Sequence, residues 1–174
     1  MLQPTAPFTN GVCCYNVSMI YDIIILGGGP AGTAAAVYVA RKKLKTLLIT
    51  ESFGGQSIVS DDIENWIGDK HIGGLDLAKR FEEHVKNYPD DIDLKMPETV
   101  KEVKKIKCAS GDRVCDFEVV TDKGKYEGKV VILAMGANRR RLGVPGEDEF
   151  EGKGVSYCST CDAPLFKGMK VAVV

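Results

Sequence analysis

One segment, residues 21–51 (YDIIILGGGPAGTAAAVYVARKKLKTLLITE), constrains the fold more than any other part of the chain. An apolar run rich in β-branched residues, 21–26, leads directly into glycines, and an Ala-rich stretch that favours a helix, 31–44, follows. A second apolar run covers residues 46–50. Short continuous apolar runs of this kind indicate strands that are buried on both faces. The segment therefore predicts a strand–helix–strand unit with parallel strands and a right-handed crossover.

The glycines at the strand–helix junction have the spacing of a dinucleotide-binding turn. They are Gly27, Gly29 and Gly32, with Pro30 and Ala31 between the last two. In such a turn the first glycine permits a tight bend, the second lets the backbone approach a pyrophosphate, and the third lets the helix pack close to the strand. The helix N-terminus adds free N–H groups and the positive end of its dipole. A glycine turn that binds nothing is the alternative, and the strand–helix context disfavours it.

An acidic residue follows at the position where the same kind of site needs one. Glu51 ends the second strand, nineteen residues after Gly32. A carboxylate there accepts hydrogen bonds from the ribose hydroxyls of the adenosine and repels a 2′-phosphate. We therefore expect the adenosine to belong to FAD or NAD rather than to NADP, and these residues alone leave FAD and NAD as alternatives.

The middle of the chain predicts one amphipathic helix and then short strands. Apolar side chains recur at helical spacing at Leu77, Phe81, Val85 and Tyr88. Pro89 follows as a stop signal. His84 is expected on the surface of this helix and His71 in a loop, neither with a catalytic role. Residues 92–126 alternate as strands, with turns at 109–113 and 122–124. A fully buried strand is expected over residues 129–137, ending at Gly136.

Composition and charge exclude several classes of function. The hydrophobic fraction of 44% and the charged fraction of 27% are those of a globular protein. The formal net charge is −1, so no nucleic-acid or membrane partner is expected. The basic run 101–107 alternates with apolar residues and is expected at a solvated strand edge. Residues 1–18 lack the features of a secretory signal; we expect a disordered tail, with Met19 as an alternative start.

The six cysteines fall into three pairs: Cys13 with Cys14, Cys108 with Cys115, and Cys158 with Cys161. They are too few and too scattered for a disulfide scaffold, and no export signal precedes them. A reducing compartment is therefore expected. In such a compartment a Cys-x-x-Cys motif is more often catalytic or metal-binding than structural.

The motif Cys158-Ser-Thr-Cys161 predicts a redox-active dithiol. On a helix its thiols lie about one turn apart, where a disulfide can close, and a helix N-terminus lowers the pKa of a thiol. Asp162 follows and can carry a proton when thiolate and disulfide interconvert. A zinc site shared with Cys108 and Cys115 is disfavoured by the spacing of that second pair. The polar sequence YCSTCD disfavours buried packing residues. No metal is expected.

Several motifs, in their order and spacing, resemble the bacterial thioredoxin reductase family. They are GGGPAG, GGQ, ENW-GD, AMGA, VPGE and YCSTCDAP, spread over residues 19–174. The flavoprotein subunit of alkyl hydroperoxide reductase shares most of them. The resemblance implies that the glycine turn and the acidic residue bind FAD. By position it also implies further cofactor-binding residues: Gly55, Gln56, Asn65, Gly136 and Ala137. Met135 departs from the family, which usually has Thr there.

The resemblance also implies a path for electrons and a role for each thiol. Electrons would pass from NADPH to FAD, then to the Cys158–Cys161 pair, and then to thioredoxin or a thioredoxin-like protein. Cys161 would face the flavin, Cys158 would attack the partner's disulfide, and Asp162 would serve as the acid. A homodimer is expected on the same ground, and the reducing compartment expected above is the cytoplasm.

The expected fold is α/β: a Rossmann-like FAD-binding domain with a parallel sheet and a small antiparallel meander, and then the start of a second, NADPH-binding Rossmann-like domain. We expect a tail over 1–18, the N-terminal portion of the FAD-binding domain over 19–143, and a connector with the Cys-x-x-Cys motif over 144–174.

The run KVAVV, 170–174, resembles a first Rossmann strand, but no glycine turn follows it. We therefore expect an inactive N-terminal fragment of a thioredoxin-disulfide reductase. A peroxiredoxin-reducing flavoprotein and a non-enzymatic nucleotide- or zinc-binding module are the alternatives.

Overall fold

A computed structural model of the chain describes residues 19–106, 117–137, 139–158 and 163–174. The expected tail over 1–18, the expected turn at 109–113, Cys161 and Asp162 therefore lie outside the described residues. The chain divides into two compact units, one ending at Gly136 and the other beginning at Ala137. Within the described part of the chain, no helix is long and apolar enough to span a membrane.

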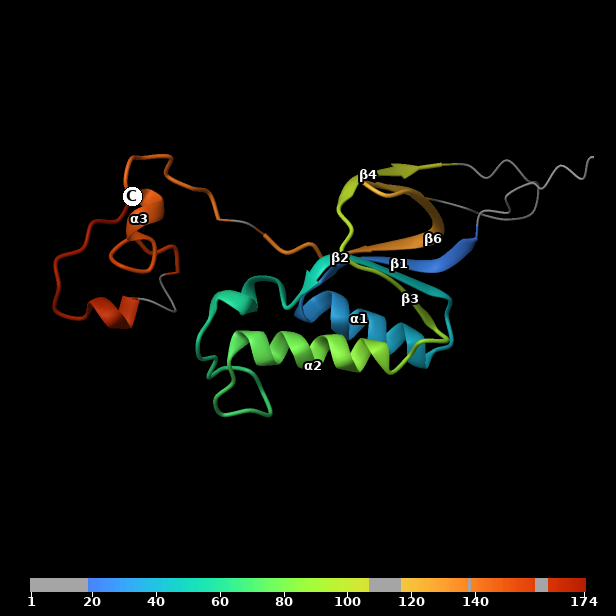
Figure 1. Ribbon diagram of the computed structural model, residues 1–174, viewed down its shortest axis with the longest axis horizontal. Helices are drawn as coiled ribbons and strands as arrows, with labels where there is room; N and C mark the ends of the chain where they lie inside the picture. Colours follow the sequence, from blue (N-terminus) through green and yellow to red (C-terminus); the bar gives the residue numbers. More distant parts are fainter. Residues whose placement is uncertain (1–18, 107–116, 138, 159–162) are drawn as a thin grey trace, which may run out of the picture. The chain divides into compact units, whose positions relative to one another are not determined.

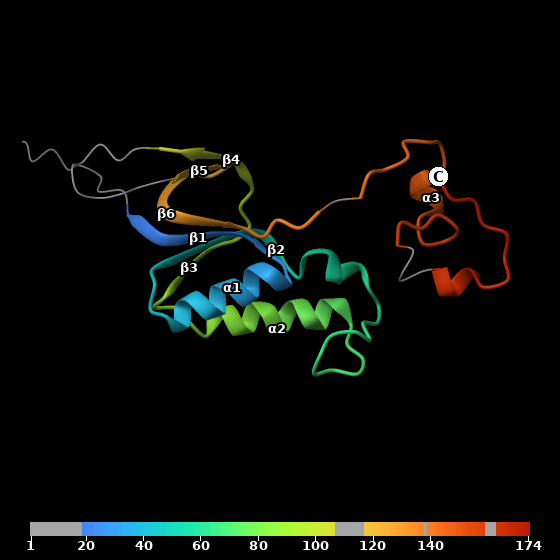
Figure 2. The same cartoon turned by 180° about the vertical axis from the view of Figure 1, so that it is seen from behind.

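The first unit is built on a six-stranded sheet with the strand order β3-β2-β1-β6-β5-β4. Its strands are β1 (Ile20–Gly28), β2 (Thr46–Phe53), β3 (Ile92–Lys95), β4 (Val100–Lys105), β5 (Phe117–Thr121) and β6 (Lys125–Leu133). Strands β3, β2, β1 and β6 run parallel, whereas β5 runs antiparallel to both β6 and β4. The two helices lie on one face of the parallel strands and the β4–β5 ribbon lies on the other (Figures 1 and 2). The predicted α/β architecture, a parallel sheet with an antiparallel meander, is confirmed.

The central strand β1 is buried on both faces, as its largely apolar sequence predicts. Ile25 packs with Leu48 in a core on the helix side. Its neighbours Ile24 and Leu26 join Val119 of β5 in a second core on the other side. Side chains alternate between the faces of a strand, so only a strand covered on both sides needs apolar residues at every position.

Two helices cover one face of the sheet. Helix α1 (Pro30–Arg41) follows the glycine turn at once, with Pro at its first position, where a missing N–H costs no hydrogen bond. Helix α2 (Gly74–Lys86) buries Leu77, Phe81 and Val85 and leaves His84 exposed. The predicted amphipathic helix is confirmed, and it ends at its C-cap Asn87 before the expected stop signal.

Strand β6 differs from the fully buried strand expected over 129–137. It runs from Lys125 to Leu133 as one continuous strand that pairs with both β5 and β1. Val130 is 48% exposed and Leu133 is 69% exposed. The expectation of full burial was wrong because the described residues do not cover these two side chains. Strand β4 is exposed at the edge of the sheet, as the alternation in the basic run predicts.

The second unit has little regular structure in its described residues. It contains the short helix α3 (Glu147–Phe150), the 3₁₀ helix η2 (Ala163–Phe166) and an isolated bridge between Glu151 and Val155. The strand expected over 170–174 is not formed, and these residues are exposed. A strand is stabilised by hydrogen bonds to neighbouring strands and by burial of a face. No neighbouring strand is described beside this run.

Candidate functional site

The carboxyl ends of the parallel strands bring the predicted dinucleotide-binding residues to one edge of the sheet. Strand β1 ends at Gly28, directly before helix α1, and Gly28 is in register with Phe53 at the end of β2. The 3₁₀ helix η1 (Gly55–Val59) follows, and the N–H of Gly54 donates a 3.0 Å hydrogen bond to the carbonyl of Gly28. This hydrogen bond joins the loops that follow β1 and β2, at the edge of the sheet where ligands of open α/β sheets bind (Figure 1).

Two of the three motif glycines are required by the protein's own packing. Gly27 has φ +109°, and a Cβ there would lie 2.3 Å from the carbonyl oxygen of Ala134. A Cβ on Gly32 would lie 1.8 Å from the carbonyl oxygen of Gly27. The first glycine thus allows the turn beside β6, and the third allows helix α1 to approach the turn, as the spacing predicts.

The second motif glycine faces open space. Gly29 has φ −75°, which suits any residue, and a Cβ there would meet only the Cα of Gly55, 3.9 Å away. No packing in the described residues requires glycine at this position. The space beside Gly29 is a cradle that a Cβ would partly fill, and this geometry fits the close approach of a pyrophosphate.

The start of helix α1 offers hydrogen-bond donors to that space. Gly29 is the N-cap, and no side chain of the described residues caps this helix end. The first intrahelical bond runs from the N–H of Thr33 to the carbonyl of Gly29, at 2.9 Å. The preceding N–H groups of Ala31 and Gly32 have no intrahelical acceptor and suit an anion.

Behind the turn, a threonine holds its backbone in place. The N–H of Gly28 donates a 2.9 Å hydrogen bond to the hydroxyl oxygen of Thr50, which donates a 2.7 Å bond to the carbonyl of Ser52. This β2 side chain therefore connects the glycine turn to the end of β2. Nothing in the sequence distinguishes Thr50, because it is one of several β-branched residues in the strand.

The remaining predicted cofactor-binding residues are exposed and come from separate segments. Glu51 lies in β2 two residues before its end, Gln56 lies in η1, and Asn65 lies in the loop between η1 and α2. Gly136 closes the first unit with φ +67°, whereas Ala137 begins the second unit. The structure thus brings the glycine turn and Gly55 together, and places Glu51 on the strand that leads into η1.

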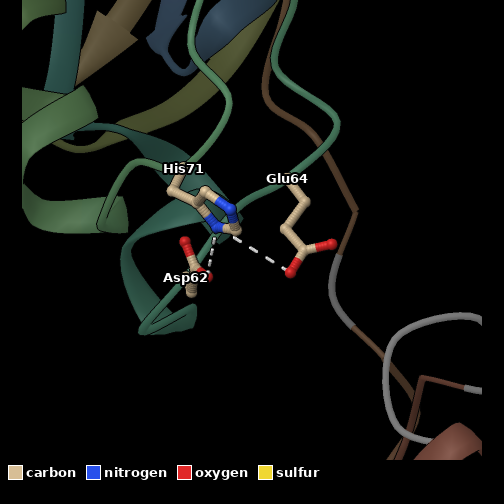
Figure 3. Close-up of side chains that lie close together, drawn as sticks. All are labelled: Asp62, Glu64 and His71. Atoms are coloured by element: carbon tan, nitrogen blue, oxygen red, sulfur yellow. Dashed lines mark hydrogen bonds and ion pairs between the residues drawn. The ribbon is translucent and has the colours of Figure 1, made fainter.

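A group of three side chains that the sequence did not single out lies in the loop between η1 and α2. His71 Nδ1 lies 2.9 Å from a carboxylate oxygen of Asp62 and 3.8 Å from one of Glu64 (Figure 3). The backbone bridge between Ile63 and Ile72 brings the two ends of the loop together. The hydrogen bond with Asp62, with the charges of both carboxylates, raises the pKa of His71. All three side chains are exposed, so they form a surface ion-pair group.

The predicted dithiol lies only partly within the described residues. Cys158 is disulfide-bonded, and its N–H donates a 3.3 Å hydrogen bond to the hydroxyl oxygen of Ser156. All five other cysteines lie outside the described residues, and so does Asp162. The pairing of Cys158 with Cys161 therefore stays a prediction.

Comparison with known proteins gives the same family from sequence and from structure. The family model for pyridine nucleotide-disulphide oxidoreductases matches residues 21–174. An NADH dehydrogenase of Bacillus subtilis is 44% identical over 155 residues, covering 88% of this chain and 28% of that protein. An alkyl hydroperoxide reductase subunit of Pseudomonas aeruginosa is 42% identical over 154 residues, covering 88% of this chain and 29% of that protein.

Among solved structures, the thioredoxin reductase of Streptococcus pyogenes superposes with a TM-score of 0.69 at 38% identity. The match covers 84% of this chain and 45% of that one. The chain thus spans less than a third of the two sequence relatives and under half of the reductase. The resemblance to thioredoxin reductases seen in the sequence motifs is confirmed, and the fold is that of their Rossmann-like domain.

Proposed function

This chain belongs to the pyridine nucleotide-disulphide oxidoreductase family, and from that premise we propose that it is the FAD-binding part of a thioredoxin-disulfide reductase. The observation that carries the proposal is the open space beside Gly29, next to an uncapped helix N-terminus. The likeness to the streptococcal thioredoxin reductase supports this choice within the family. Bound FAD would supply two-electron transfer between a nicotinamide and a disulfide.

The residues of the first unit bind and orient the cofactor. The backbone at Gly29 allows the pyrophosphate to approach, and the N–H groups of Ala31 and Gly32 donate to it. Glu51 accepts hydrogen bonds from the adenosine ribose. Gln56 and Asn65 contact the flavin end of the cofactor, by analogy with the resembling family.

In the second unit, the proposed chemistry is thiol–disulfide exchange at the Cys158–Cys161 pair. The thiolate of Cys158 attacks a disulfide of thioredoxin, which forms a mixed disulfide and releases one thiolate of the partner. The thiolate of Cys161 then attacks Cys158, which closes the intramolecular disulfide and releases the second thiolate. Asp162 transfers the proton during re-reduction. The electrons come from NADPH, and we propose a homodimer in the cytoplasm.

A second candidate is favoured by one of the sequence relatives. The alkyl hydroperoxide reductase subunit is 42% identical to this chain. The same flavin site and dithiol would then serve a peroxiredoxin rather than thioredoxin. The two candidates share the cofactor and the chemistry of the thiols and differ in the protein partner.

Flavin binding tests the proposal directly. The purified chain, mixed with FAD and freed of unbound cofactor, should retain the visible absorption spectrum of an oxidised flavin. Glu51→Ala should lower the retained flavin, while Glu83→Ala, at an exposed glutamate of α2, should retain as much as the native chain. A colourless chain with native circular dichroism would refute the proposal. Equal retention by Glu51→Ala would remove Glu51 from the site.

A further inference from the structure

A buried carboxylate stands out in the second unit because its surroundings are otherwise exposed. Glu147, the first residue of helix α3, is only 5% exposed. The next two residues of the helix, Asp148 and Glu149, are exposed. An ionised carboxylate is buried only where hydrogen bonds and opposite charge replace water.

Glu147 has such partners on both of its oxygens. The N–H of Leu142 donates a 3.0 Å hydrogen bond to Oε1, and the N–H of Gly143 donates a 2.6 Å bond to Oε2. The guanidinium Nε of Arg141 lies 3.2 Å from Oε1, and the hydroxyl of Tyr157 donates to the same oxygen. The Glu147 side chain therefore connects residues 141–143 to Tyr157, which lies ten positions after Glu147.

The local charges keep this carboxylate ionised. Burial raises the pKa of Glu147, but the backbone N–H groups of Gly143 and Leu142 and the charge of Arg141 outweigh it and lower the pKa below its ordinary value. Arg141 also pairs with Asp148, and with Glu151 at 3.0 Å. A network of several charges holds its geometry better than a single exposed pair.

The network reaches the residue next to the thiol. Tyr157 precedes Cys158, and the guanidinium carbon of Arg141 lies 5.9 Å from the centroid of the Tyr157 ring. Tyr157 is thus held at its hydroxyl by Glu147 and over its ring by Arg141. Because consecutive residues share a peptide unit, fixing Tyr157 restricts the backbone that carries Cys158.

We propose that Glu147 is a positioning residue for the dithiol: it anchors Tyr157 and so holds the backbone of Cys158 in a conformation in which its disulfide closes readily. This inference rests on the proposed function, because it takes Cys158 and Cys161 as the reacting pair. A pre-ordered thiol has a higher effective concentration toward its partner than a mobile one. Loss of the anchor shifts the equilibrium toward the reduced dithiol. We expect a shift of about tenfold, the factor for freeing the backbone of roughly one residue.

The equilibrium can be measured on the full chain in glutathione buffers. Two glutathione thiols reduce the protein disulfide, giving two protein thiols and one molecule of glutathione disulfide. After alkylation of free thiols, mass spectrometry gives the oxidised fraction of the peptide that contains Cys158 and identifies the cysteine bound to it. The variants are Tyr157→Phe, Glu147→Gln and the double variant. Glu149→Gln is the control, since it removes the same charge from an exposed position of the same helix.

The expected result has three parts. Tyr157→Phe and Glu147→Gln each shift the equilibrium about tenfold toward the dithiol, which is about 30 mV for a two-electron couple. The double variant shifts it no further than the larger single change, because both act through one contact. The control Glu149→Gln matches the native chain.

Other outcomes would overturn the inference. Native equilibria in both single variants would do so, and so would fully additive shifts, which would mean that Glu147 does not act through Tyr157. If Glu147→Gln does not fold, Tyr157→Phe decides alone: a shift supports the inference and a native value refutes it. Cys158 bound to a cysteine other than Cys161 would overturn both the inference and the proposed dithiol chemistry. A Cys158–Cys161 pair unaffected by the variants overturns the inference alone.

Discussion

Substituting alanine at Gly29 or at Gly32 tests whether each glycine is needed for ligand binding or for folding. At Gly29 the methyl would meet only the Cα of Gly55, 3.9 Å away, and the backbone φ of −75° suits alanine. Alanine is a poorer N-cap than glycine by about 0.5 kcal/mol. It also reduces the entropy of the unfolded chain, which stabilises by about 0.4–1 kcal/mol. The free energy of unfolding of Gly29→Ala should therefore stay within about 0.5 kcal/mol of the native value.

At Gly32 the same change meets the protein itself. The methyl would lie 1.8 Å from the carbonyl oxygen of Gly27, while real Cβ contacts almost never fall below 3.0 Å. Helix α1 and the turn must separate by at least the difference, 3.0 − 1.8 = 1.2 Å. The obstructing atom belongs to the backbone and cannot rotate away. Gly32→Ala should therefore lose about 3 kcal/mol, the upper end of the usual cost of overpacking.

The effect of Gly29→Ala on FAD binding should be larger than its effect on stability. The added methyl group occupies the space through which we propose that the pyrophosphate of FAD approaches, so the dissociation constant of FAD should rise at least about tenfold, or about 1.4 kcal/mol. Urea unfolding without cofactor gives the stability, and titration of flavin fluorescence gives the affinity. A folded Gly29→Ala chain that binds FAD with native affinity would refute the assignment of the space beside Gly29 to the pyrophosphate. Native stability in Gly32→Ala would refute the packing argument.

Three further predictions concern stability. Leu48→Ala, at a fully buried side chain of β2, should lower the free energy of unfolding by about 2–5 kcal/mol in urea titrations; a loss below about 1 kcal/mol would contradict the core assignment. Burial and a hydrogen bond with Glu98 raise the pKa of Tyr126 to about 12. Because the unfolded tyrosine loses its proton near pH 10, stability should fall as the pH rises from about 10 toward 12, and Tyr126→Phe should flatten that fall in thermal melts. Asp62 raises the pKa of His71, so their contact stabilises below the unfolded pKa of about 6.5 and is lost as the pH rises through the higher folded value. Proteolysis of the loop 60–73 should therefore be faster at about pH 8 than at about pH 6, and His71→Gln should abolish the difference.

The folding of the first unit follows from local sequence to a large extent. The glycine spacing, the apolar runs on either side and the helical spacing of Leu77, Phe81 and Val85 predicted the elements that are observed. Backbone conformation and periodicity are properties of neighbouring residues, so they can be identified without knowing the fold. Gly32 is the clearest example, because a Cβ there would meet the carbonyl oxygen of Gly27 in the same strand–helix turn.

Burial was harder to predict. The apolar sequence of β6 suggested a strand covered on both faces, yet Val130 and Leu133 are largely exposed in the described chain. An apolar run shows that a strand can be buried, but whether it is covered depends on what packs beside it. The run over 170–174 illustrates the same limit, since its strand-like sequence has no described neighbour to pair with.

Only the tertiary structure distinguished residues of the same type by their surroundings. In the sequence, Glu147, Asp148 and Glu149 are three successive acids after a Pro-Gly turn, and nothing marks the first of them. In the fold, Glu147 alone of the three is buried, between residues 141–143 and Tyr157. Likewise, Asp62 and His71 meet because a backbone bridge brings the two ends of their loop together. The sequence therefore determined which backbone turns and periodicities were possible, since these depend on adjacent residues. The fold decided which side chains share one environment, because that depends on contacts between residues distant along the chain.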